Sequence, residues 1–378
     1  MRHFLPRVRI ARSDHADLVR LAQACLEGCR TTASDGTVLF CPDGQAHYAA
    51  LWTRDFCYML EGAGDLFDPA EALAAMDYLL AGQREDGVIP DRRQPDGYSA
   101  YKAGPAGKPL GYGPPADNGP FMAKLVCAYA RHTNDYSALA RRVPALAAAL
   151  DSVPLGPEGL VHIDPNRPMP GYGFTDCIAK TGKDFFASLL YWEACQNLAR
   201  TCVDFEYHEE AREWYERCEV MYAHLNELWD GEHGMFRSAS HDCRQLDIWG
   251  SAYAAVVRAA SKSQAQRIAE FLTTTYDDYV LRGHVRHLPR GEYWKRTFTD
   301  VPRDTYQNGG FWAVPTAWVA QTITLVDEER GRRLVLDALD EFREFGVHEW
   351  ISPTERYVPG YVASAANLLA GTMPTKVL

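Results

Sequence analysis

The sequence predicts an all-α fold, an (α/α)6 toroid in which twelve helices form six hairpins around one axis. Apolar residues recur at the spacing of one helix face, as in Leu18, Leu21, Ala22, Cys25 and Leu26. The links between helices alternate between short and long, and short links force neighbouring helices to run antiparallel. Because the alternation places all long links at one end of the ring, we expect a deep polar mouth there.

The expected helices follow one another in chain order. They cover residues 14–30, 53–66, 69–83, 117–132, 136–150, 184–202, a stretch around 214–228, 247–260, 264–281, 309–326, 327–345 and 360–371. Pro69 suits the first turn of the third helix. Asp117 and Asn118 are expected to cap the fourth. Pro144 implies a kink or a late start in the fifth. An open solenoid shows a similar rhythm, but the sequence carries no repeat of fixed period.

Composition and length limit the class of protein. The chain has 378 residues, 47% of them hydrophobic and 12% aromatic, as in a folded globule with a large core. No linker or shift in composition divides it, so we expect residues 1–378 to form a single catalytic domain. The net charge is −11 and no basic block occurs, which disfavours nucleic acid and anionic membranes as partners.

Targeting and metal signals are weak in this sequence. It shows neither a signal peptide nor a run long and apolar enough to cross a bilayer. Its ten cysteines are scattered without paired spacing or histidine clusters. We therefore expect a cytoplasmic protein with reduced thiols, no metal and no cofactor, while its oligomeric state stays open.

Chemistry concentrates where the first long link enters the second helix, at Trp52, Arg54 and Asp55. A guanidinium and a carboxylate can hydrogen-bond hydroxyls while an aromatic ring stacks on a C–H face, which suits a polyol. The alternative is a carboxylate that only favours the helix dipole, beside a solvated arginine. The other long links add carboxylates, amides and aromatic rings, with more acidic than basic groups. These groups fit a small neutral carbohydrate substrate better than an anionic one.

Three motifs resemble those of the six-hairpin glycosidases, which include glucoamylases, trehalases, processing α-glucosidases and neutral invertases. Trp52-Thr53-Arg54-Asp55-Phe56 resembles their Arg-Asp-Phe substrate motif. Tyr306-Gln307-Asn308-Gly309-Gly310-Phe311-Trp312 resembles their entry to the tenth helix. Glu349-Trp350-Ile351-Ser352-Pro353, followed by Gly360-Tyr361, resembles the segment that holds the catalytic base. Neutral invertases are nearest in size.

The resemblance implies an inverting glycoside hydrolase with two catalytic carboxyl groups. Asp176 matches the acid that protonates the leaving oxygen, and Glu349 matches the base that activates water. Inverting enzymes hold such a pair about 6.5–9.5 Å apart to admit the water. The residues expected to bind substrate are Trp52, Arg54, Asp55, Asp117, Asn118, Lys180, Glu292, Trp294, Asn308, Trp312 and Glu355.

Alternatives remain for both catalytic residues and for the activity. Thr175-Asp176-Cys177 departs from the acid motif of some relatives, so Asp117 is a second candidate acid, and Glu355 a second candidate base. An N-acylglucosamine-epimerase-like isomerase would instead use His284, His287 or His348. The other rivals are a non-catalytic carbohydrate-binding barrel and, less favoured because its substrate is anionic, a polysaccharide lyase.

Overall fold

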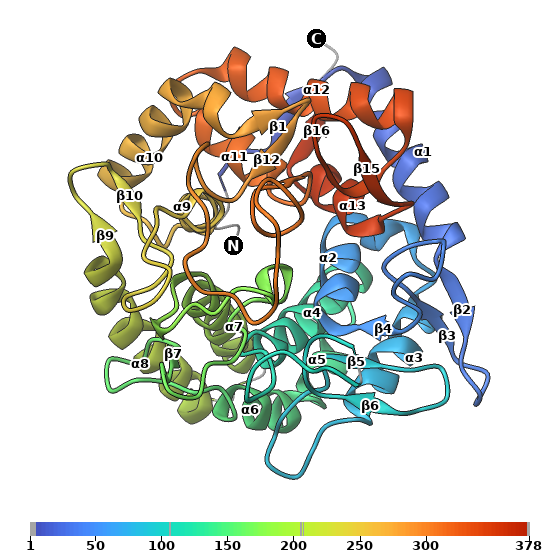
Figure 1. Ribbon diagram of the computed structural model, residues 1–378. Helices are drawn as coiled ribbons and strands as arrows, with labels where there is room; N and C mark the ends of the chain where they lie inside the picture. Colours follow the sequence, from blue (N-terminus) through green and yellow to red (C-terminus); the bar gives the residue numbers. More distant parts are fainter. Residues whose placement is uncertain (1–4, 106, 205, 207, 376–378) are drawn as a thin grey trace.

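The computed structural model describes residues 5–105, 107–204, 206 and 208–375, and its helices follow one another around a ring in sequence order (Figure 1). Within these residues, twelve α-helices have seven residues or more. The α-helices are α1 Arg12–Gly28, α2 Thr53–Ala63, α3 Pro69–Leu80, α4 Asn118–Thr133, α5 Tyr136–Ala140, α6 Val143–Asp151, α7 Phe185–Asp204, α8 His208–Leu225, α9 Ile248–Val256, α10 Lys262–Thr274, α11 Thr316–Ile323, α12 Glu328–Phe345 and α13 Val362–Ala370.

Most predicted helices form, but several ends differ. The predicted fifth helix is two helices, α5 and α6, and Pro144 stands in the first turn of α6, as a late start requires. The predicted ninth helix stops at Thr274, because the chain then forms a short 3₁₀ turn and a strand. Helix α11 begins at Thr316 rather than Gly309, because Phe311–Trp312 is extended and pairs with a neighbouring strand.

The long links are not free of regular structure, which corrects the all-α prediction. Short strands pair within and between them: β2 Arg30–Thr32, β3 Val38–Phe40, β4 Leu51–Trp52, β5 Arg92–Arg93, β6 Ser99–Ala100, β7 His162–Ile163, β8 Gly182–Lys183, β9 Trp229–Asp230, β10 Met235–Phe236, β11 Val280–Leu281, β12 His284–Arg286, β13 Phe311–Trp312, β14 His348–Ile351 and β15 Arg356–Pro359. Two further strands, β1 Val8–Ile10 and β16 Thr372–Pro374, lie at the ends of the described chain. Strands β11 to β15 form one antiparallel sheet in that order. Strands of two to four residues are too short to show a period of two in the sequence.

Six helices line the inside of the ring and the others cover them. Helix α2 packs on α4, α4 on α7, α7 on α9, α9 on α11, α11 on α13, and α13 on α2. The inner helices α9 and α11 are buried along their whole length. Outer helices such as α12 bury one stripe, which includes Leu334, Val335, Ala338, Leu339 and Phe342. Parallel pairing of β1 with β16 brings the two ends of the described chain together.

Helices α2 and α13, which are far apart in sequence, approach each other closely (Figure 1). A Cβ added at Gly62 of α2 would lie 1.9 Å from the carbonyl oxygen of Ala366 on α13. Only glycine permits this approach, so Gly62 fixes how the first inner helix meets the last. All six inner helices begin directly after a long link, so their N-termini face the long-link end.

A charged cluster lies among four inner helices. The ammonium of Lys124 on α4 donates a hydrogen bond to the Tyr253 hydroxyl at 2.5 Å and lies 2.8 Å from Glu193 Oε2 and 3.5 Å from Glu61 Oε2. The Tyr253 hydroxyl in turn donates to Glu193. Lys124 is completely buried, so its charge is balanced by the carboxylates of Glu61 on α2 and Glu193 on α7.

None of the described helices has the length and apolar character needed to span a membrane.

We expect Lys124→Met to lower the free energy of unfolding by about 3–5 kcal/mol, because it leaves two carboxylates facing each other in the interior. Chemical denaturation would measure this. The matched control is Arg332→Met, which removes an exposed arginine paired with Glu329 and should cost less than about 1 kcal/mol. Equal losses in the two variants would show that the buried cluster does not hold the inner helices together.

Candidate active site

A pocket opens at the end of the ring where the long links meet. Its empty volume is about 350 Å³, including space open to solvent. Its walls come from four of the six long links and from the first turn of α2: Pro42, Tyr48, Trp52, Arg54, Asp55, Gly173, Phe174, Asp176, Tyr306, Trp312, Glu349 and Tyr361. Three carboxyl groups and one guanidinium therefore share the pocket with six aromatic rings.

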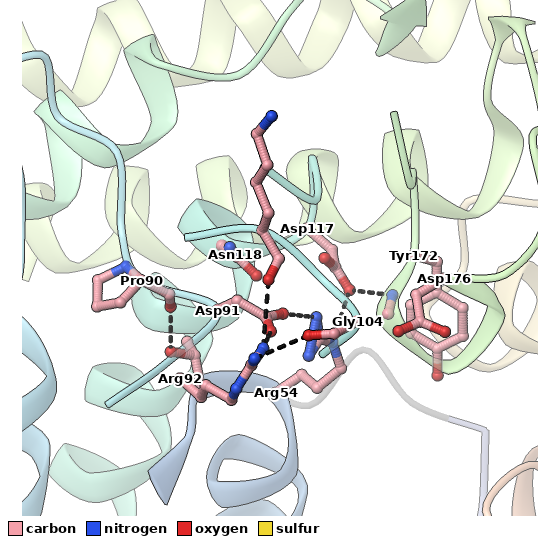
Figure 2. A network of polar contacts seen from close by, with 12 residues as sticks. Arg54, Pro90, Asp91, Arg92, Gly104, Asp117, Asn118, Tyr172 and Asp176 are labelled. Carbon is pink, nitrogen blue, oxygen red and sulfur yellow. Dashed lines mark hydrogen bonds and ion pairs between the residues drawn. The ribbon is translucent and has the colours of Figure 1, made fainter. Parts of the chain in front are cut away.

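Arg54 is fixed in the pocket wall by two buried carboxylates. Its Nη2 donates to Asp91, and its Nε donates to Asp117 Oδ2 at 3.4 Å (Figure 2). Arg92 Nη1 also donates to Asp91, at 2.8 Å. Asp91 and Asp117 are both fully buried, so the guanidinium stays charged and in one place.

Gly173 completes the enclosure of Arg54. Its N–H donates to Asp117 Oδ2 at 2.7 Å. A Cβ added at Gly173 would lie 1.6 Å from Arg54 Nε. A glycine is therefore required there for the third long link to pass over the guanidinium.

Asp117 does not cap α4 with its side chain, which corrects the prediction from sequence. Its carboxylate instead joins α2 to the third long link.

The Trp52 ring is in contact with two guanidinium groups and with the ring of Tyr48. The guanidinium carbon of Arg92 is 4.5 Å from the Trp52 ring centroid and that of Arg54 is 5.9 Å away. Tyr48 meets the same ring edge-on, with centroids 5.5 Å apart. The buried Trp52 Nε1 has no hydrogen-bond acceptor among the described residues. This buried indole N–H, beside the pocket, is therefore left without a partner in the described part of the chain.

Asp176 enters the pocket from the third long link. Its Oδ1 accepts a hydrogen bond from Gln307 Nε2 at 2.7 Å. Burial raises the pKa of Asp176 from 3.8 to about 6, although the Gln307 hydrogen bond and the charge of Arg54 act in the opposite direction. The carboxyl group can therefore carry a proton in mildly acidic solution.

Glu349, on β14 of the five-stranded sheet, lies in the same pocket. The Tyr48 hydroxyl is 2.9 Å from its Oε1 and 3.0 Å from its Oε2, and donates to this carboxylate. Burial raises the pKa of Glu349 well above its ordinary value. The Tyr48 hydrogen bond opposes that shift, and the negative charges of Asp55 and Asp176 add to it. The pocket carboxyl groups are therefore close enough to influence one another's ionisation.

Asp55 stands in the first turn of α2 and accepts a hydrogen bond at 2.5 Å from the hydroxyl of Tyr361, the residue that precedes α13. Burial raises the pKa of Asp55 to about 6, while Arg54 and Tyr361 lower it. The contact joins the first and last inner helices at the pocket.

The predicted site residues divide into two groups. Trp52, Arg54, Asp55, Asp176, Trp312 and Glu349 line the pocket, whereas Asp117, Asn118, Lys180, Glu292, Trp294, Asn308 and Glu355 lie outside its walls. Glu292 and Glu355 are exposed, and Glu355 accepts a hydrogen bond from Tyr357. Asn118 donates to the backbone of Ile89 at 3.3 Å. The second candidate base thus lies in solvent.

Trp294 and Asn308 join two parts of the fifth long link. Trp294 Nε1 donates to the carbonyl of Gln307 at 2.8 Å, and its backbone N–H donates to Asn308 Oδ1 at 3.0 Å. These contacts support the segment that carries Gln307. They place both residues behind the pocket wall rather than in it.

Lys180 lies in a second buried polar cluster. Its Nζ is 4.0 Å from Asp184 Oδ2 and 5.6 Å from the Trp294 ring, and has no hydrogen-bond acceptor among the described residues. In the same region His287 Nε2 lies 2.9 Å from Asp247 Oδ1. Asp184 and Asp247 precede α7 and α9 and accept N–H groups of those helices.

The histidines proposed for an isomerase are not in the pocket. His284 and His348 each face a backbone carbonyl through Nδ1, at 3.0 Å, and His287 stacks on Trp249 with ring centroids 4.2 Å apart. Among the described residues, no group of three or more His, Cys, Asp or Glu side chains is arranged to hold a metal ion.

The sequence did not predict the two side chains that bind the candidate catalytic carboxyl groups, Tyr48 and Gln307. Tyr48 lies in an irregular link with no helical or strand pattern around it. Gln307 stands inside the motif from Tyr306 to Trp312, whose glycines and aromatic residues carry the resemblance to the glycosidases. Both could be found only from the fold, because each meets a partner more than a hundred residues away.

The raised pKa of Asp176 has a consequence for stability. The folded state binds a proton between about pH 4 and 6 that the unfolded state has lost, so stability falls as pH rises through this range. We expect Asp176→Asn to raise the free energy of unfolding by on the order of 1–2 kcal/mol at pH 8 and to leave it nearly unchanged at pH 4.

Urea denaturation at the two pH values would measure this effect. The control is Asp277→Asn, at an exposed position, which should change neither value. A loss of stability at pH 8 in Asp176→Asn would contradict the expectation.

Comparison with known proteins shows similarity in fold. No known family model and no curated protein matches the sequence. An uncharacterized conserved protein from Thermus thermophilus matches with a TM-score of 0.69 and 17% identity, over 93% of this chain and 99% of that one. A GH63 mannosylglycerate hydrolase from the same organism, in complex with glucose, matches with a TM-score of 0.67, 17% identity and the same coverage.

A rhamnosidase from Klebsiella oxytoca, with rhamnose bound, matches with a TM-score of 0.68 and 13% identity, over 97% of this chain and 65% of that one. Identities this low establish similarity of fold alone. The protein shares the fold of the six-hairpin glycosidases, which confirms at that level the resemblance inferred from its motifs.

Proposed function

We propose that this protein is an inverting glycoside hydrolase that acts on a small saccharide or glycoside, built as a single (α/α)6 toroid. The observation that carries the proposal is that Asp176 and Glu349, from links far apart in sequence, line one pocket with Arg54, Asp55 and aromatic rings. Glycoside cleavage with inversion needs two such carboxyl groups on either side of the scissile bond.

Hydrogen bonds favour one division of roles between the two groups. The Tyr48 hydroxyl lies within hydrogen-bond distance of both Glu349 oxygens, and its donation to this carboxylate favours the ionised form. Asp176 accepts the Gln307 amide N–H on Oδ1, and its Oδ2 is the oxygen that would carry a proton. Because two nearby carboxyl groups cannot both ionise freely, the pair holds one proton in the active form. Asp176 then protonates the leaving oxygen, and Glu349 removes a proton from water.

The same pocket offers groups for the sugar. Trp52 and Trp312 provide aromatic rings in its wall, and Asp55 and Arg54 provide hydrogen-bonding groups. Asp91 and Asp117 balance the charge of Arg54 from behind. The remaining charge in the pocket is therefore negative, which favours a neutral sugar in it. Asp117, Asn308 and Trp294 serve to position the links rather than to touch the sugar.

The decisive experiment is a panel of glycosides assayed with the wild type, Asp176→Asn and Glu349→Gln. We expect both variants to lose at least about 100-fold in kcat on natural linkages, as general acid–base catalysis contributes that much. On a dinitrophenyl glycoside, whose leaving group needs no proton, Asp176→Asn should recover most of its rate, while Glu349→Gln should not. Glu355→Gln, at an exposed position, is the control and should keep full activity.

Full activity of Asp176→Asn on an unactivated glycoside would overturn the acid assignment. Sugars that bind and shift the melting temperature, without any released product, would instead favour a non-catalytic binding barrel.

The pH profile of kcat/KM gives a separate test. Asp176 must be protonated, so the rate should fall as pH rises through about 6. Glu349 must be ionised, and burial raises its pKa, so the rate should also fall as the solution becomes more acidic. We expect a bell-shaped profile, in which Asp176→Asn removes the alkaline limb and Glu349→Gln removes the acid limb. A rate that stays constant from about pH 5 to 9 would contradict both assignments.

A further inference from the structure

We propose that Gln307 is a positioning residue for the acid: it holds Asp176 Oδ1 as a hydrogen-bond acceptor and so confines the acidic proton to Oδ2. The inference deepens the proposed function and rests on it for its catalytic meaning. It identifies a residue of this chain that acts on the proton without touching the substrate.

The orientation of the Gln307 amide is determined by its two partners. Its Oε1 accepts the backbone N–H of Cys177 at 2.8 Å, and its Nε2 lies 2.7 Å from Asp176 Oδ1. If the amide were flipped, an NH₂ group would face the Cys177 N–H, and a carbonyl oxygen would face the carboxylate. Both contacts would then be repulsive. The amide therefore donates to Asp176 and accepts from the next peptide group.

The main chain around Gln307 is held as firmly as its side chain. Gln307 is 3% exposed, and its carbonyl accepts the Trp294 indole N–H at 2.8 Å. The next residue, Asn308, accepts the Trp294 backbone N–H and donates to the carbonyl of Val301 at 2.9 Å. The Gln307 amide is thus held rigidly, and it connects the fifth long link to the third, which carries Asp176.

The hydrogen bond from Gln307 determines which oxygen of Asp176 carries the proton. The hydroxyl oxygen of a neutral carboxyl group is a much poorer acceptor than its carbonyl oxygen, so the oxygen that faces Nε2 remains the carbonyl. The proton must then sit on Oδ2. A fixed proton position matters for general acid catalysis, because the donor has to lie within hydrogen-bond reach of the leaving oxygen.

Other groups also act on the ionisation of Asp176. The positive charge of Arg54 lowers its pKa and the negative charge of Asp91 raises it. Glu349, Tyr48, Tyr306 and Cys177 also interact electrostatically with this carboxyl, and the Cys177 thiol is hydrogen-bonded to it. A change at Gln307 removes none of these groups, although it also takes away the acceptor of the Cys177 backbone N–H. A shift in the titration of Asp176 is then attributable to the lost amide.

The first experiment needs no activity. Asp176 would be titrated by ¹³C NMR of carboxyl-labelled protein, with its signal identified by its absence in Asp176→Asn. We expect Gln307→Met, which has similar volume and no N–H, to raise the pKa of Asp176 by on the order of half to one unit. The sign follows because the lost hydrogen bond favoured the ionised form.

The matched control is Gln321→Met. Gln321 is also buried, but its amide donates to the carbonyls of Leu5 and Pro6, away from the pocket. It should leave the Asp176 titration unchanged. An Asp176 pKa that is the same in Gln307→Met and the wild type would overturn the proposal. If the Met variant does not fold, Gln307→Glu replaces it, and a carboxylate beside Asp176 should raise that pKa further.

The second experiment reads the catalytic effect. In Gln307→Met we expect kcat on an unactivated glycoside to fall about tenfold, since the proton is less well placed. KM should hardly change, and the rate on a dinitrophenyl glycoside should be nearly that of the wild type. An equal loss on both substrates, with an unmoved alkaline limb, would indicate a merely structural role and overturn the inference.

The two experiments separate this inference from the proposed function. If the wild type hydrolyses no glycoside but the NMR titration shifts as expected, the proposed function fails while the control of Asp176 by Gln307 stands. If glycosides are hydrolysed but the titration does not shift, the inference fails alone.

Discussion

The arrangement of the pocket depends on one buried guanidinium. Arg54 projects from the first turn of α2 and binds Asp91, which precedes β5, and Asp117, which precedes α4. Asp117 also binds the N–H of Gly173, three residues before Asp176. An ion pair removed from water is stable only when its geometry is good and its remaining hydrogen bonds are made. The charge of Arg54 therefore fixes the second and third long links relative to α2, and the third carries the candidate acid.

The opposite wall has a different support. Glu349 lies on β14, within the antiparallel sheet that the last two long links form together. Strand β13, which ends at Trp312, is its neighbour. The two candidate catalytic groups are thus held by different means, one by an ion-pair network and the other by a sheet. Gln307 links the two walls, because it belongs to the loop before β13 and binds Asp176.

The sequence predicted the helices better than the links. Apolar stripes reveal a helix because burial of one face is local and periodic, so the alternation of inner and outer helices was visible before the structure. The mouth residues were predicted from their position in a long link, but this position does not determine where a side chain points. Lys180, Trp294 and Asn308 therefore lie behind the wall although they were expected to bind substrate. Asp117 stands at the position of a helix cap, but its carboxylate accepts hydrogen bonds from the buried Arg54 and from the Gly173 N–H.

The central claim is that Asp176 and Glu349 face one bound sugar. A crystal structure of the protein soaked with an iminosugar, whose charged ring imitates the oxocarbenium-like transition state, tests it most directly. The account predicts a ring held in the pocket beside Trp52 and Trp312, with Asp176 on one side of its anomeric position and Glu349 on the other. An iminosugar bound elsewhere on the molecule, or held with both carboxyl groups on the same side of the ring, would contradict the account.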